Sequence, residues 1–165
     1  MSMIGNFVRV TPQQLDSFLA DSSLLENHIY DDDVEGLLDI DKNWDILNYT
    51  ITGYKLVDSD KASAPLKYVI FGGQTIDDAQ DLGCGPAQYL PAAQVQEVSA
   101  ALDAISIDEF KKRYVAAAND SEGVYPEVWT DDDETAQIVA EEFELLKAFY
   151  AEAARNGMAV VGWLT

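Results

Sequence analysis

The chain has 165 residues, a length that fits one domain (1–165) and can bury a core without disulfides. It is strongly acidic, because 30 Asp and Glu residues oppose 10 Lys and Arg residues and give a net charge of −20. A field of that sign repels phosphate backbones and argues against direct nucleic-acid binding. No signal peptide or long apolar segment stands out, so we expect a cytoplasmic protein without a membrane partner.

The acidic residues are concentrated in particular stretches. Nine lie between Arg9 and Lys42, and ten lie between Arg113 and Lys147, in each case with no Lys or Arg among them. Such charge has two interpretations. It either keeps the protein soluble or attracts a basic protein partner by long-range electrostatics. The sequence does not say whether these stretches meet on one face after folding.

The first half of the chain predicts short elements. Residues 4–10 predict a strand that leads into a helix with a capping box from Thr11 to Gln14. A second short helix is expected from about Ser22. Farther along we expect a strand at 37–40, a helix from Asp41 to a stop at Gly53, a polar loop at 55–64 and a short strand at 87–90. Residues 65–71 fit either a short helix or a buried strand.

The second half predicts longer helices. Pro91 begins one helix, and the Ser-x-x-Glu capping box of Ser106 to Glu109 begins the next. The longest helix is expected at about 132–155, followed by a strand at 158–164. Two terminal strands with many helices between them predict an α+β fold. We expect a small mixed or antiparallel sheet that includes both terminal strands, with helices packed on one side.

Several motifs occur in a fixed order along the chain: Met3-Ile4-Gly5, Leu38-Asp39-Ile40-Asp41-Lys42-Asn43-Trp44-Asp45-Ile46-Leu47, Thr52-Gly53, Pro65-Leu66, Gly72-Gly73, Asp81-Leu82-Gly83, Gly85-Pro86-Ala87 and Tyr125-Pro126. Together they resemble the YfbM-like family of small bacterial proteins, and the resemblance covers essentially the whole chain. It implies an α+β fold and a bacterial origin, but the family is a domain of unknown function and implies no activity or cofactor. The chain departs from the family at Asn48, where members often carry His, and at Cys84, where they often carry an aromatic residue.

The sequence offers little catalytic or metal chemistry. With His28 and Cys84 as the one His and the one Cys, no zinc site of the Cys/His type can form. No Gly-x-Ser-x-Gly motif is present to pair with His28. The run 39–43 resembles the start of a calcium loop, but Trp44 replaces its turn glycine and Thr50 its bidentate Glu. We therefore expect no metal and no cofactor.

Two groups of residues remain as candidate binding sites. The first is the set Asp39, Asp41, Lys42, Trp44 and Asp45, in which strand alternation would point Asp39 and Asp41 to one side. Carboxylates beside a Trp and a Lys suit acid–base work or a cationic ligand. The structural alternative is that Asp41 caps a helix, Lys42 is solvated and Trp44 belongs to the core.

The second group lies in an aromatic loop. Tyr125, Pro126 and Trp129 are typical of a recognition surface, but equally of a loop folded onto the core. We interpret the chain as a non-catalytic binding module with an acidic surface, inhibitor-like or immunity-like towards a basic protein. The alternative is a small hydrolase-type enzyme that uses the carboxylates of residues 39–45.

Overall fold

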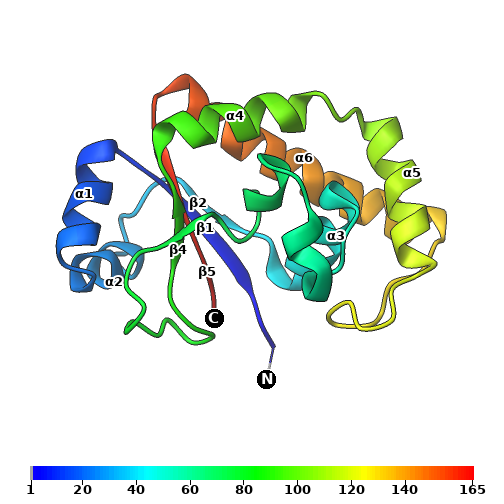
Figure 1. Ribbon diagram of the computed structural model, residues 1–165, viewed down its shortest axis with the longest axis horizontal. Helices are drawn as coiled ribbons and strands as arrows, with labels where there is room; N and C mark the ends of the chain where they lie inside the picture. Colours follow the sequence, from blue (N-terminus) through cyan, green and yellow to red (C-terminus); the bar gives the residue numbers. More distant parts are fainter. Residues whose placement is uncertain (1) are drawn as a thin grey trace.

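The computed structural model describes residues 2–165 and shows an α+β fold around one antiparallel sheet (Figure 1). The strands are β1 (Gly5–Val10), β2 (Leu37–Asp39), β3 (Gln74–Thr75), β4 (Gln88–Leu90) and β5 (Ala159–Leu164), in the spatial order β2-β1-β5-β4-β3. The terminal strands β1 and β5 pair at the centre of the sheet, from Gly5 opposite Leu164 to Val10 opposite Ala159. The predicted fold class is confirmed, and the sheet is antiparallel.

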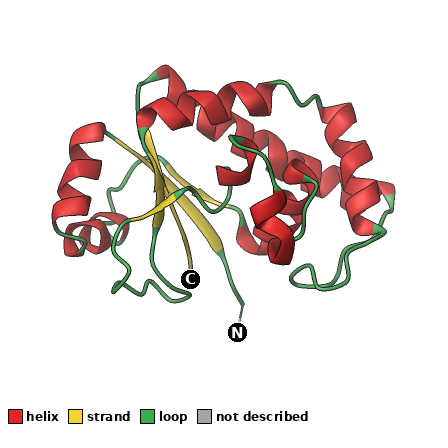
Figure 2. Cartoon of the chain, in the orientation of Figure 1, coloured by secondary structure: helices red, strands yellow, loops and turns green. Residues whose placement is uncertain are grey.

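Helices cover both faces of this sheet. One face packs against α1 (Pro12–Ala20) and α2 (Ser23–Ile29). The other face borders the larger core, which it shares with α3 (Trp44–Thr52), α4 (Ala92–Asp103), α5 (Ile107–Ala118) and α6 (Asp133–Arg155). Figure 2, in the same orientation as Figure 1, shows α1 and α2 to the left of the strands, α3, α5 and α6 to their right, and α4 across the top. The expectation that helices pack on one side only is therefore wrong.

The physical reason is that the central strands are apolar on both faces. Along β5, Val160 points into the larger core with α3–α6, whereas Val161 and Trp163 point into the smaller core with α1 and α2. A strand buried on both faces lacks the apolar–polar alternation of a half-exposed one. The residues at 159–163 are all buried, which agrees with a two-sided core.

Three short segments differ from the expectations. A 3-10 helix at Asp41–Asn43 precedes α3, and a second one at Leu56–Lys61 occupies the segment expected to be a polar loop. Residues 65–71, for which α-helix and strand were both open, contain a 3-10 helix at Leu66–Tyr68. The two-residue strand β3 was not predicted, because so short an edge strand carries no periodicity.

The helix ends follow local chemistry. The Thr11 side chain accepts the N–H of Gln14, and the Gln14 side chain accepts the N–H of Thr11, which confirms the predicted capping box. At the end of α3, Gly53 adopts the left-handed conformation expected of a helix stop. Ser106 accepts the N–H of Glu109, but the Glu109 carboxylate pairs with Arg113 at 3.0 Å rather than returning to the cap.

Candidate functional site

The first candidate group is divided by the end of β2. The strand ends at Asp39, whose Oδ1 accepts the main-chain N–H of Asp41 at 2.7 Å. Asp41 has a left-handed backbone with φ of 47° and begins the 3-10 helix. Strand alternation therefore does not extend to Asp41, and the expectation that it places both side chains on one side of a strand is wrong. Asp41 also does not cap α3, whose N-cap is Asn43.

Asp39 and Asp41 instead form an acidic corner with Glu142 of α6. Both aspartates are exposed, and Glu142 is half-buried, with its Oε2 unpaired among residues 2–165. Burial raises the pKa of Glu142, and the negative charges of Asp39, Asp41 and Glu141 raise it further. The acidic corner, defined as Asp39, Asp41 and Glu142, brings charges from the two acidic stretches of the sequence within electrostatic reach of one another. Glu142 was not among the predicted site residues.

Trp44 lies in the core beside the aromatic loop. Its ring stacks on Tyr125 with centroids 5.4 Å apart and meets Phe71 edge-on at 5.7 Å. Its indole N–H donates to the carbonyl of Met3 at 3.2 Å, and the N–H of Met3 donates to the Tyr125 hydroxyl at 2.9 Å. These contacts join the segment before β1, the start of α3 and the aromatic loop.

Asp45 is the buried carboxylate of the set. Its Oδ2 accepts the main-chain N–H of Tyr125 at 2.9 Å, whereas its Oδ1 is buried without a partner among residues 2–165. Burial raises the pKa of Asp45, and the hydrogen bond from Tyr125 partly opposes that shift. The neighbouring Asn48, one turn later on α3, also has an unpaired side-chain nitrogen in this part of the chain. Asp45 thus fixes the aromatic loop to α3.

The aromatic loop packs against the core. Tyr125 and Trp129 are both partly buried, and the indole N–H of Trp129 donates to the carbonyl of Tyr125 at 3.0 Å. These contacts are those of a loop folded onto the core, which is one of the two interpretations that the sequence allows for this segment. Tyr125 joins Trp44 and Asp45, so the structure brings part of the second candidate group to the first.

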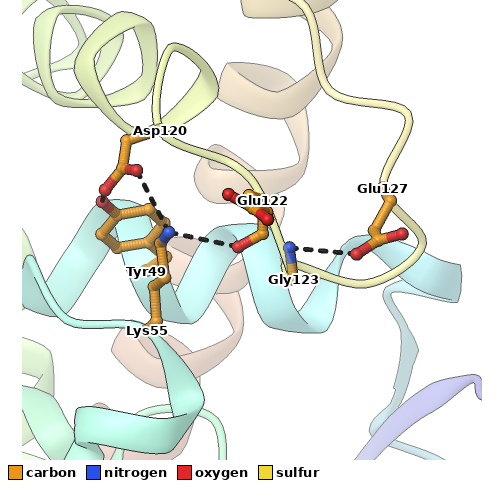
Figure 3. A network of polar contacts seen from close by, with 6 residues as sticks. All are labelled: Tyr49, Lys55, Asp120, Glu122, Gly123 and Glu127. Carbon is orange, nitrogen blue, oxygen red and sulfur yellow. Dashed lines mark hydrogen bonds and ion pairs between the residues drawn. The ribbon is translucent and has the colours of Figure 1, made fainter.

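A polar network holds the other end of this loop (Figure 3). Asp120 accepts the Tyr49 hydroxyl at 2.9 Å and pairs with the Lys55 ammonium at 3.2 Å. Lys55 also donates to the carbonyl of Glu122, and Glu127 accepts the N–H of Gly123. The loop is therefore fixed to α3 and the residues after it at both ends.

A small apolar pocket of about 180 Å³ lies beside Trp44 at one end of the sheet. Its walls are mostly aromatic or aliphatic, with the thiol of Cys84 and the side-chain amide of Gln88 among them. The lining residues are Gly5, Phe7, Trp44, Ile70, Phe71, Cys84, Pro86, Gln88, Gly162, Trp163 and Leu164. No carboxylate is among them, so Asp39 and Asp41 do not converge with Trp44 in one pocket.

The remaining candidates contribute little to a shared site. Lys42 is half-buried and forms no ion pair with the described residues. Across residues 2–165, no group of three or more His, Cys, Asp or Glu side chains is arranged to hold a metal ion. His28 packs its ring 5.5 Å from that of Phe18. None of the described helices has the length and apolar character needed to span a membrane.

Comparison with known proteins gives a family. The chain is 28% identical to protein YfbM of Escherichia coli (strain K12) over 167 residues, which cover 95% of each chain. The crystal structure of YfbM from Escherichia coli, a protein of unknown function, has the same fold, with a TM-score of 0.73 and 19% sequence identity. That match covers 98% of this chain and 99% of the other. Residues 1–163 match the family described as a domain of unknown function (DUF1877), and the chain belongs to that family.

Proposed function

We propose that this protein is a non-catalytic binding module that captures a basic protein partner through its acidic surface. The proposal is supported by the number of carboxylates without a cation. Among residues 2–165, ion pairs with Lys or Arg engage Asp58, Glu109, Asp120 and Glu152, out of 30 acidic residues in the chain. The field of the others attracts cationic proteins and accelerates their encounter.

The observation that carries the proposal is the acidic corner. Asp39 and Asp41 come from the stretch between Arg9 and Lys42, whereas Glu142 comes from the stretch between Arg113 and Lys147. Their charges are near enough for Asp39 and Asp41 to raise the pKa of Glu142. Like charges gathered at one place destabilise the free protein, and a bound cationic group relieves that repulsion. A basic partner therefore gains the most binding free energy by placing a cationic group at this corner.

The geometry supports the hydrolase alternative less well. That alternative needs Asp39, Asp41 and Trp44 in one pocket with a substrate. The pocket beside Trp44 has no carboxylate in its lining, and the two aspartates are exposed outside it. Asp45 has a raised pKa, but its hydrogen bond goes to the backbone of Tyr125 rather than to a pocket. An inhibitor-like or immunity-like role needs only a surface that matches a basic partner.

The proposal is tested by capture of basic proteins from a host lysate. The wild-type chain is compared with a triple variant, Asp39→Asn, Asp41→Asn and Glu142→Gln. In this variant the asparagine at position 39 keeps an acceptor for the N–H of residue 41, and the asparagine at position 41 tolerates a left-handed backbone. The matched control carries Asp60→Asn, Glu97→Gln and Asp103→Asn, which remove the same charge from exposed positions on other elements.

We expect the wild-type chain and the control to retain the same partner at about 0.1 M salt and to release it near 1 M, where charges are screened. The triple variant should retain at least tenfold less, about 1.4 kcal/mol of binding free energy. Equal loss in both variants would mean that net charge acts without a defined corner. Recovery of no specific protein at low salt would remove the support for a basic partner.

A further inference from the structure

The strand β2 forms one edge of the sheet. It pairs with β1 on one side and has no strand on the other in the described part of the chain. Leu37 is 47% exposed, and Asp39 is exposed beside it. A free edge offers unpaired main-chain N–H and C=O groups that another chain can pair with.

The register shows which groups are free. Arg9 donates its N–H to the carbonyl of Gly36, and Ile40 donates its N–H to the carbonyl of Gly5. In an antiparallel pair such hydrogen-bonded positions alternate with positions whose main-chain groups point outward. Leu37 opposite Val8, and Asp39 opposite Asn6, are the outward-pointing positions. The edge therefore presents two N–H donors and two carbonyl acceptors.

The opposite edge of the sheet offers less. β3 has two residues, and the hydrogen bond from the N–H of Ile76 to the carbonyl of Ala87 sets the alternation there. By the same rule, Thr75 alone in β3 presents outward main-chain groups. Its side chain and that of Gln74 are already hydrogen-bonded across to β4, at Gln88 and Tyr89. β2 is thus the better template for an added strand.

Charge selects what can pair with β2. The acidic corner adjoins this edge, because Asp39 belongs to β2 and Asp41 follows two residues later. Edge strands are commonly protected from self-association by charged side chains. A second copy of this chain would bring its own Asp39 and Asp41 against the same carboxylates, which opposes homodimerisation through β2. A positively charged segment is instead attracted to these carboxylates.

We propose that an extended, basic segment of the partner adds to β2 as a further strand of the sheet. The inference rests on the proposed capture of a basic partner and names the surface and the chemistry of recognition. Main-chain hydrogen bonds to Leu37 and Asp39 supply a sequence-independent part of the binding, as in other cases of strand addition. Lys or Arg side chains of the segment supply the specificity by facing the acidic corner.

The register also predicts the pattern of the segment. The residue opposite Asp39 is basic, and the residue opposite Leu37, two positions away, is apolar because Leu37 is exposed there. The residue between them points to the other face of the sheet, with Leu38 and α6, where a basic side chain suits Glu142. A blocked peptide Lys-Lys-Val-Lys-Lys has this pattern when it pairs antiparallel to β2, and its valine opposite Leu37 then exchanges main-chain hydrogen bonds with that residue.

The test titrates the whole isotope-labelled chain with this peptide and follows the main-chain amides by NMR. We expect the Leu37 and Asp39 amides to shift and to gain protection from hydrogen exchange. Methylation of the valine nitrogen keeps every charge but removes one strand hydrogen bond, and should weaken binding about three- to tenfold. Asp39→Asn should weaken binding, whereas the control Asp60→Asn should not.

Two results would overturn strand addition. The first is equal affinity for the methylated peptide without protection of the Leu37 and Asp39 amides, which would mean electrostatic contact alone. The second is the absence of any peptide binding at low salt. In either case, capture of a basic protein that the triple variant loses would still support the proposed function, so the two failures are distinguishable.

Discussion

At the scale of single residues, Asp45 has the least ordinary environment among the predicted site residues. It is 3% exposed, pairs one oxygen with the N–H of Tyr125, and leaves the other buried without a partner among the described residues. Burial raises its pKa above the ordinary 3.8, so the folded chain holds the proton more tightly than the unfolded chain does. The stabilising contribution of this group is therefore complete below pH 3.8 and is lost as pH rises through its folded pKa.

Replacement of Asp45 tests this direction of the pH dependence of stability. Asp45→Asn keeps an oxygen for the N–H of Tyr125 and removes the buried charge. At pH 7 its free energy of unfolding should therefore exceed that of the wild type, and the difference should shrink as pH falls through the folded pKa of Asp45 and be largely absent below pH 3.8. Asp45→Ala leaves that N–H unpaired and should be less stable than Asp45→Asn by about 1–3 kcal/mol. The measurement is urea unfolding across this pH range. A wild type more stable than Asp45→Asn at pH 7 would mean that the charged hydrogen bond outweighs burial.

The sequence supplied candidate residues but not their arrangement in space. Trp44 and Asp45 lie next to each other in the sequence, but their partner Tyr125 is 80 residues beyond Asp45, so no local pattern could place it there. The acidic corner was missed for a similar reason, because Glu142 belongs to an amphipathic helix on which an acidic residue is ordinary. Strand alternation failed at Asp41 because its left-handed backbone ends the strand, and Asp is one of the few residues that adopt this conformation.

At the scale of elements, helix boundaries were the most predictable feature. The longest helix was expected at about 132–155 and is found at Asp133–Arg155, with Asp132 as its N-cap. The apolar stripe of this helix faces the core: Val139, Phe143, Leu146, Tyr150 and Ala153 are all buried. The conformation of residues 65–71 was not predictable because a short, mostly apolar run fits several conformations, and tertiary packing decides among them.

The N-cap of α6 provides a prediction at this scale. The Asp132 carboxylate accepts the N–H of Thr135 at 2.9 Å and the hydroxyls of Thr130 and Thr135. These hydrogen bonds lower the pKa of Asp132 to about 2, so its stabilising contribution is present above pH 3.8 and is lost as pH falls through about 2. Asp132→Ala should therefore lower the unfolding midpoint at pH 6, and the difference should largely vanish near pH 2.

The neighbouring Asp131 is the matched control for this N-cap. It is exposed in the same loop, and no side-chain hydrogen bond of Asp131 is found within the described chain. Asp131→Ala should leave the unfolding midpoint at pH 6 close to that of the wild type, as measured by circular dichroism in urea. If both variants lose the same stability, the cause is the general effect of negative charge near the start of α6 rather than the cap.

At the scale of the whole molecule, a two-sided core is combined with a very acidic exterior. Both faces of the sheet are covered by helices, which gives this chain of 165 residues two hydrophobic clusters around β1 and β5. The net charge of −20 opposes this compact state, because the folded chain holds its carboxylates closer together than the unfolded chain does. Stability and partner binding therefore depend on charge in opposite directions.

Salt should separate these two effects. Between about 0.1 M and 1 M NaCl the Debye length falls from about 10 Å to about 3 Å, which screens repulsion among the carboxylates. The thermal midpoint should rise by about 2–4 °C for each kcal/mol of repulsion removed, as followed by calorimetry. Over the same range, binding of the basic partner should weaken, because the attraction is screened as well.

The triple variant at Asp39, Asp41 and Glu142 and its charge-matched control separate local repulsion from that of the whole surface. If repulsion is concentrated at the acidic corner, the triple variant should have the higher midpoint at low salt and the smaller rise with salt. The control has the same net charge as the triple variant but keeps the acidic corner, so its midpoint should lie closer to that of the wild type. A midpoint that falls with salt would contradict repulsion as the dominant effect. It would indicate that the ion pairs of Lys55, Lys61, Arg113 and Arg155 stabilise the folded chain by more than the repulsion among carboxylates destabilises it.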